Sequence, residues 1–166
     1  MGVSTIYTKF LDKLITVIEG ILILLLAVAI GIVGTQIVFR YVFDSPLSWS
    51  EQGARCIFIW LTMLSVPCIF RRKGMIAFDL IINNLPDKVK SVLEIVVQLI
   101  VLFFAVYYFY YSLKLCISTG SRVMAGVAIP QNLMYISQPI SMAFLILVMI
   151  EQFIQTVTKL RGGEAK

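Results

Sequence analysis

The sequence predicts an all-α integral membrane protein with four transmembrane helices and short interfacial amphipathic helices. The 166-residue chain is 60% hydrophobic and only 14% charged, whereas ordinary soluble domains are about 25% charged. Four apolar runs reach the roughly 20 residues that a helix needs to cross a bilayer. A soluble fold of this size could not cover so much apolar surface, so the chain belongs to the membrane class.

The four predicted spans lie at about residues 14–43, 50–70, 89–118 and 130–158. Backbone amides cannot stay unpaired in hydrocarbon, which restricts the spans to helices or a closed β-barrel. The runs do not alternate as barrel strands do, so helices are favoured. No internal repeat or linker divides the chain, and we expect one membrane domain covering residues 1–166.

An amphipathic stretch, residues 4–18, precedes the first uncharged run. Its apolar residues recur on one helical face, and Lys9 and Lys13 flank that face. We expect an interfacial helix there, with a simple extension of the first span as the alternative. The same two alternatives apply to residues 74–86, which are apolar but too short to span. The first run is too long for a signal peptide and no A-x-A site follows, so we expect it to remain as a span.

Aromatic residues and prolines mark the later spans. Four tyrosines near the end of the third run predict an aromatic belt at the headgroup level, rather than a ligand cage. In the fourth run, Pro130 is typical of a helix start. Pro139 lies inside that run and predicts a packed kink, with a functional break as the alternative. The tyrosines are Tyr107, Tyr108, Tyr110 and Tyr111.

The distribution of basic residues predicts the orientation. With both termini in the cytoplasm, ten basic residues lie inside and four outside. The four outer residues are Arg40, Arg55, Lys114 and Arg122. The net charge of +5 therefore indicates contact with anionic phospholipids rather than nucleic acid. The ten inner residues are Lys9, Lys13, Arg71, Arg72, Lys73, Lys88, Lys90, Lys159, Arg161 and Lys166.

The composition also argues against catalysis and bound cofactors. Histidine is absent, which excludes histidine-ligated haem or zinc within this chain. The three cysteines, Cys56, Cys68 and Cys116, lack CxxC spacing and are typical of buried apolar positions. No nucleophile–base pair or phosphate-binding glycine loop is evident. We therefore expect no catalytic residues, no metal and no cofactor.

Charges concentrate in the turn between the first two spans, 39-FRYVFDSPLSWSEQGARCIFIW-60. Pro46 ends the first helix, and 48-SWSE-51 matches a capping box for the second. Glu51 and Arg55 have the spacing of a helical ion pair. One interpretation is that these residues only stop one helix and start the next.

That interpretation explains Arg40 and Arg55 less well, because a cation near hydrocarbon needs a partner or must reach the interface. Asp44 follows Arg40 by one turn. We therefore expect an ionic cluster that joins the first two helices or faces a partner protein. Trp49 suits an interfacial anchor.

This stretch continues to residue 81 as a pattern that resembles the small membrane subunit of tripartite ATP-independent periplasmic (TRAP) transporters, the DctQ-like family. The matching features are RYVF, SPLSWSE, an Ala-Arg pair, FIWLT, which contains Trp60, and a basic RR followed by Gly-x-Ile-x-x-Asp, which ends at Asp79. They cover about a quarter of the chain, and its length and four-span layout agree. Many relatives have His where this chain has Met75, so any role of that His is absent here.

The resemblance implies a non-catalytic subunit of a sodium-driven importer of organic anions, such as sialic acid or C4-dicarboxylates, in the bacterial inner membrane. The implied partners are a large elevator-type membrane subunit and a periplasmic binding protein. From this motif we expect one set of residues, in and just after the outer turn, to contact a partner or another helix. We expect a second set, at and after the end of the second span, to contact lipid headgroups or the cytoplasmic interface. The first set is Arg40, Asp44, Trp49, Glu51, Arg55 and Trp60, and the second is Arg71, Arg72, Lys73 and Asp79.

The residues themselves favour a passive role. Acidic residues are few and lie near the ends of the spans, whereas a sodium site needs several oxygen ligands at mid-membrane depth. Ala27, Gly31 and Thr35 are spaced four apart and offer a weak signal for close helix packing. The alternative is a self-sufficient four-helix proton-coupled exporter, for which Glu19 is the candidate acid. Asp79 is expected to pair with one cation of the basic run.

Overall fold

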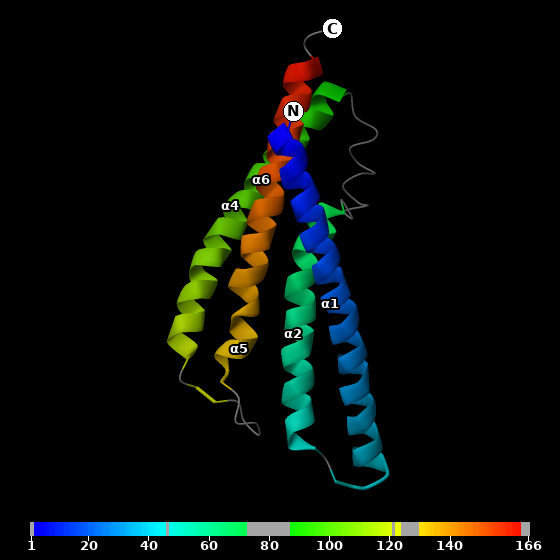
Figure 1. The fold of residues 1–166 in the computed structure, drawn as a ribbon. Helices are drawn as coiled ribbons and strands as arrows, with labels where there is room; N and C mark the ends of the chain where they lie inside the picture. Colours follow the sequence, from blue (N-terminus) through cyan, green and yellow to red (C-terminus); the bar gives the residue numbers. More distant parts are fainter. Residues whose placement is uncertain (1, 46, 73–86, 121, 124–129, 164–166) are drawn as a thin grey trace.

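The computed structural model describes residues 2–45, 47–72, 87–120, 122–123 and 130–163. Within these ranges the chain forms helices α1 (Gly2–Tyr41), α2 (Ser48–Arg71), α4 (Asp87–Thr119), α5 (Asn132–Tyr135) and α6 (Ser137–Gly163), drawn in Figure 1. Four segments are long and apolar enough to cross a membrane: Tyr7–Tyr41, Trp49–Arg71, Val92–Thr119 and Asn132–Thr158. The predicted all-α, four-span fold class is confirmed.

The long helices form two pairs. α2 packs against α1 and also contacts α6, which in turn packs against α4. Figure 1 shows the α1–α2 pair and the α4–α6 pair close together at one end and diverging toward the other. α1 begins and α6 ends at the close end. We call this the Arg71 end, because α2 terminates there, and the opposite end, where α2 begins, the Glu51 end.

α1 is one unbroken helix. Its 40 residues measure about 60 Å at 1.5 Å per residue, twice the roughly 30 Å hydrocarbon core. Residues 4–18 are therefore an extension of the first span, as the alternative prediction had it, and not a separate helix. The second predicted interfacial segment, residues 74–86, lies outside the described residues.

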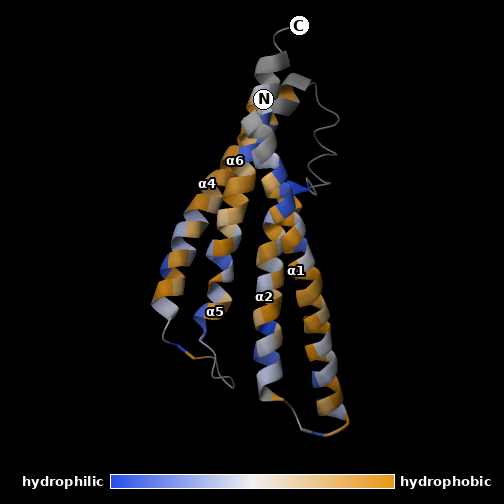
Figure 2. Cartoon of the chain, viewed as in Figure 1, coloured by the Kyte–Doolittle hydropathy of each residue, from blue (hydrophilic) through white to orange (hydrophobic). Residues whose placement is uncertain are grey.

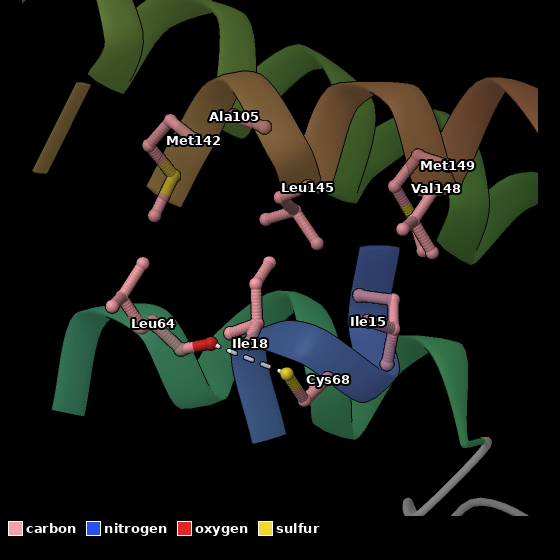
Figure 3. Close-up of a cluster of buried hydrophobic side chains, with 9 residues drawn as sticks. All are labelled: Ile15, Ile18, Leu64, Cys68, Ala105, Met142, Leu145, Val148 and Met149. Atoms are coloured by element: carbon pink, nitrogen blue, oxygen red, sulfur yellow. Dashed lines mark hydrogen bonds between the residues drawn. The ribbon is translucent and has the colours of Figure 1, made fainter. Parts of the chain in front are cut away.

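The apolar core lies toward the Arg71 end. Ile15 and Ile18 of α1 point toward Leu64 and Cys68 of α2 and a row of α6 side chains (Figure 3). Their spacing of three or four residues puts them on one face of each helix. Burial of this face joins α1, α2 and α6, together with Ala105 of α4, into one core. The α6 and α4 members are Met142, Leu145, Val148, Met149 and Ala105.

α4 approaches α6 through small side chains. Ala105, Ser112 and Thr119 are buried and lie seven residues apart, which is two helical turns. Small residues at such positions let helix backbones come close together in a membrane. Many large hydrophobic side chains of the long helices are exposed, and Figure 2 shows apolar residues along each of these helices, as expected where lipid or another membrane protein covers them.

The fourth span is interrupted near its start. α5 ends at Tyr135, and α6 begins at Ser137. Pro139 cannot donate a hydrogen bond to the carbonyl of Tyr135, four residues earlier, so the helical ladder lacks that bond. Ile136, between the two helices, keeps helical φ and ψ angles of −65° and −22°, so the kink expected at Pro139 stays a prediction. The helical part also begins at Asn132 rather than at Pro130.

The tyrosines of α4 have two different environments. Tyr107, Tyr110 and Tyr111 are exposed on the outer surface. Tyr108 instead donates a hydrogen bond from its hydroxyl to Oε1 of Gln138, at 3.2 Å. One of the four predicted belt residues therefore joins α4 to α6, and the belt itself remains a prediction for the other three.

Candidate functional site

The strongest polar contact between helices is centred on Arg71, the last residue of α2. Its Nε and Nη2 atoms donate to Oδ1 of Asp12 at 3.0 and 2.8 Å, and its Nη1 donates to Oε2 of Glu151. The Arg71 side chain is only 10% exposed and that of Glu151 only 5%. One guanidinium therefore joins α1, α2 and α6.

Neutral groups complete the environment of Glu151. Thr8 of α1 donates from its hydroxyl to Oε1 of Glu151 at 2.7 Å, and Gln155 donates to the same oxygen at 2.8 Å. A buried carboxylate is tolerated only when it is paired and hydrogen-bonded. We call Thr8, Asp12, Arg71 and Glu151 the Arg71 cluster.

Arg72 forms a second pair with α1. Its Nε and Nη2 atoms donate to the two carboxylate oxygens of Glu19 at 2.8 and 2.7 Å, a bidentate geometry. The hydrogen bond to Glu19 raises the pKa of the Arg72 guanidinium. The pair is more open to solvent than the Arg71 cluster, since the Arg72 side chain is 62% exposed. Glu19, the candidate acid of an exporter, is thus held by an arginine.

Two further contacts join α2 to α5 and α6. Pro67 lies inside α2, so the carbonyl of Met63 lacks its helical donor. The hydroxyl of Ser141, fully buried on α6, donates to that carbonyl. One turn earlier, Nε1 of Trp60 donates to the carbonyl of Leu133 in α5 at 3.0 Å. Trp60, a predicted contact residue, therefore makes a contact between helices.

The Glu51 end contains a weaker ion pair. Nη2 of Arg55 lies 3.1 Å from Oε1 of Glu51, with side chains 56% and 67% exposed. The predicted i,i+4 pair is confirmed. The predicted capping box is wrong, because α2 has Leu47 as its N-cap and Ser48 is already helical. Trp49 lies exposed beside this pair.

The predicted ionic cluster between the first two helices is also wrong. Among the described residues, no salt bridge joins Arg40 to Asp44 or either of them to α2. α1 ends at Tyr41, and Asp44 has a positive φ of 48°, so Asp44 no longer follows Arg40 along a helix face. Arg40 instead lies 5.8 Å from the centre of the Tyr41 ring.

An open groove runs along α1 and α2 near the Glu51 end. Its volume is about 440 Å³, and it is lined by Gln36, Glu51, Ala54, Arg55, Phe58, Ile59 and Thr62. We call it the Gln36–Arg55 groove. Lys73 and Asp79, also predicted as site residues, lie outside the described part of the chain. No group of three His, Cys, Asp or Glu side chains suited to a metal ion occurs in the described residues.

Comparison with known proteins identifies the family. The chain matches the family described as "Tripartite ATP-independent periplasmic transporters, DctQ component" over residues 29–159. The chain belongs to the DctQ family. The resemblance in the outer turn is thereby confirmed, and with its four spans the chain is a multi-pass inner-membrane protein and a transporter component.

Individual relatives agree with this assignment. A TRAP transporter small permease protein of Haemophilus influenzae is 29% identical over 133 residues, which are 80% of this chain and 79% of the relative. The sialic acid TRAP transporter permease protein SiaT of Haemophilus influenzae is 26% identical over 90% of this chain but only 23% of its own length. The isethionate TRAP transporter permease protein DctMQ of Oleidesulfovibrio alaskensis is 28% identical over 68% of this chain and 19% of its own length.

Sequence reasoning did not find the Arg71 cluster. It interpreted Arg71 and Arg72 as lipid-facing, positive-inside residues, whereas in the structure both bind carboxylates of the bundle. A signal was present: Glu151 is an acid inside the apolar fourth run, in its last third, and such residues usually have a partner. The sequence could not say which arginine that partner is.

Proposed function

We propose that this DctQ-family chain is the non-catalytic small subunit of a sodium-driven TRAP importer of organic anions, and that it provides a stationary scaffold for a larger membrane subunit. The observation that carries the proposal is the difference in length between its relatives. The chain matches most of a small permease protein but only 23% of SiaT. In such a longer permease, most of the polypeptide lies outside the part that this chain resembles.

The ion pairs of the bundle support a passive role. Asp12, Glu19, Glu51 and Glu151 each lie within salt-bridge distance of an arginine of the same chain. These carboxylates are therefore engaged in structure rather than left free to bind a transported ion. The Arg71 cluster joins α1, α2 and α6 at one end, which suits a part of the complex that has to resist tilting.

Other parts of the proposal concern partners. Two relatives are named for sialic acid and isethionate, both organic anions, which supports that substrate class for the complex. The exposed turn between α1 and α2, with Arg40 and Asp44, is proposed to help dock a periplasmic binding protein. The exposed Arg72 and the neighbouring Lys73 are proposed to meet phospholipid headgroups on the cytoplasmic side, where both termini lie.

Reconstitution tests the scaffold function. The large subunit, with its binding protein, is placed in proteoliposomes with and without this chain, and sodium-driven uptake of radiolabelled sialic acid or a C4-dicarboxylate is measured. We expect uptake only when both membrane subunits are present. Normal uptake by the large subunit alone would refute the scaffold function. Export by this chain alone, lost in Glu19→Gln, would favour the exporter.

A further inference from the structure

The Gln36–Arg55 groove combines an apolar floor with polar groups inside predicted spans. Gln36 belongs to the span Tyr7–Tyr41, and Glu51 and Arg55 belong to Trp49–Arg71. Ala54, Phe58 and Ile59 form apolar parts of the wall. All three lie toward the Glu51 end of their spans, and a polar side chain that meets hydrocarbon there is costly unless it has a partner.

Gln36 is the most informative of these groups. It is half-buried, and its amide forms no hydrogen bond to any part of the chain that the structure describes. An amide carries two donors and one acceptor oxygen, and acyl chains offer neither donors nor acceptors. Thr62, by contrast, donates to the carbonyls of Phe58 and Ile59 in its own helix. The groove therefore has an unmet need for polar contacts at Gln36.

The described part of the bundle leaves this region open. The core cluster begins at Leu64 on α2 and lies toward the Arg71 end, and the contact of Trp60 with α5 marks where α2 meets the second helix pair. Figure 1 shows the α1–α2 pair diverging from the α4–α6 pair toward the Glu51 end. The groove on the first half of α2 is therefore available to a partner.

We propose that the Gln36–Arg55 groove receives a transmembrane helix of the large permease subunit, which offers a hydroxyl or amide group to Gln36. This inference rests on the proposed function, and it adds which face of this chain binds the large subunit. Its support is chemical complementarity: a protein helix supplies the hydrogen bonds that Gln36 lacks, and small side chains on it leave room for Phe58. Longer relatives, in which this region is part of a larger permease, supply the candidate partner.

Two other outward faces fit a partner less well. Ala27, Gly31 and Thr35 lie on the exposed face of α1, opposite the buried Ala29. Thr35 already donates to the carbonyl of Gly31 at 2.8 Å, so this face has no unmet hydrogen bond. The exposed face of α4 around Phe103 and Phe104 is apolar and suits acyl chains.

Photo-crosslinking tests the groove directly. A photoreactive phenylalanine analogue replaces Phe58 in the groove or, as a matched control, the exposed Phe103 on α4, in the complex co-expressed with the large subunit. Phe58 is expected to give a covalent product with the mass of both subunits, and Phe103 only lipid adducts. Lipid adducts alone at Phe58, or equal protein products at both positions, would overturn the proposal.

A pair of neighbouring substitutions gives an independent readout. Gln36→Leu removes the unmet amide, whereas Thr35→Val removes a polar group that is satisfied within α1. We expect Gln36→Leu to reduce the amount of large subunit that co-purifies by about tenfold, the equivalent of one lost buried hydrogen bond, and Thr35→Val to leave it unchanged. The reverse pattern would move the interface to the other face of α1.

These experiments separate the groove from the proposed function. If the unmodified chain does not co-purify with the large subunit at all, the proposed function fails. If it does co-purify but Phe58 gives no protein product and Gln36→Leu has no effect, only the groove assignment fails. Helix content of each variant, measured by circular dichroism, shows that a lost complex is not a lost fold.

Discussion

The two ends of α2 carry the same chemistry in different surroundings. At the Glu51 end, Arg55 pairs with a carboxylate of its own helix, and both side chains are more than half exposed. At the Arg71 end, Arg71 is 10% exposed and pairs with carboxylates from α1 and α6. The first pair supports one helix locally, whereas the second joins three helices. The difference teaches that the structural role of an arginine here depends on burial and on which helices it joins, not on the ion pair itself.

The largest expected effect is from Arg71→Met. The substitution leaves the buried Glu151 without a cation, and breaking a buried pair in this way costs about 3–5 kcal/mol. The purified chain should unfold at a markedly lower SDS fraction or temperature. The double substitution Arg71→Met with Glu151→Leu should recover much of that loss, because the one carboxylate left without its arginine, Asp12, is largely exposed to solvent. A loss below about 1 kcal/mol for Arg71→Met would place the Arg71 cluster in the same class as the Glu51–Arg55 pair.

The next largest effect on stability is expected from Ser141→Ala, which removes an uncharged contact between α6 and α2. Without the hydroxyl, the Met63 carbonyl has no donor, and an unsatisfied buried group costs about 1–3 kcal/mol. In a Pro67→Ala background the restored amide can bond Met63, so the same substitution should cost less. Ser137→Ala is the matched control, since Ser137 is equally buried but donates to Met134 in its own turn. Equal losses with and without Pro67 would contradict the role assigned to Ser141.

Arg72→Ala sharpens the comparison within the Arg71 end. Arg72 is bidentate to Glu19 but largely exposed, and exposed pairs contribute little to stability. We expect a small loss of stability that decreases further at high salt, because solvent screens the pair. Unfolding of wild type and variant in low and high sodium chloride measures this. A loss as large as that of Arg71→Met would mean that exposure does not distinguish the two arginines.

The smallest expected effect is from Glu51→Gln in the isolated chain. Helical i,i+4 pairs contribute about 0.3–0.5 kcal/mol, so unfolding should barely change. Arg55→Gln should give the same result, and the double variant should be no less stable than either single one. A loss above about 1 kcal/mol would show that Glu51 has a contact within the chain beyond Arg55.

Local patterns were predictable, and contacts between distant segments were not. The spans and the Glu51–Arg55 pair follow from residues that are close to one another in the sequence. The sequence also favoured an ionic cluster of Arg40 and Asp44. That cluster required the first helix to continue to Asp44, whereas α1 ends at Tyr41. The use of Arg71 and Glu151 could not be foreseen, because they are 80 positions apart.

The sequence by itself determined that this chain is a four-span helical membrane protein, since long apolar runs in hydrocarbon must satisfy their own backbone. Its motifs also determined the family. Only the tertiary structure decided which arginine meets which distant carboxylate and that Ser141 replaces the donor missing at Pro67. It also decided that Gln36, in an open groove, has no hydrogen-bond partner among the described residues. These contacts depend on how each helix is rotated and shifted relative to its neighbours. The apolar faces of the helices are too similar to one another to specify that arrangement from the sequence.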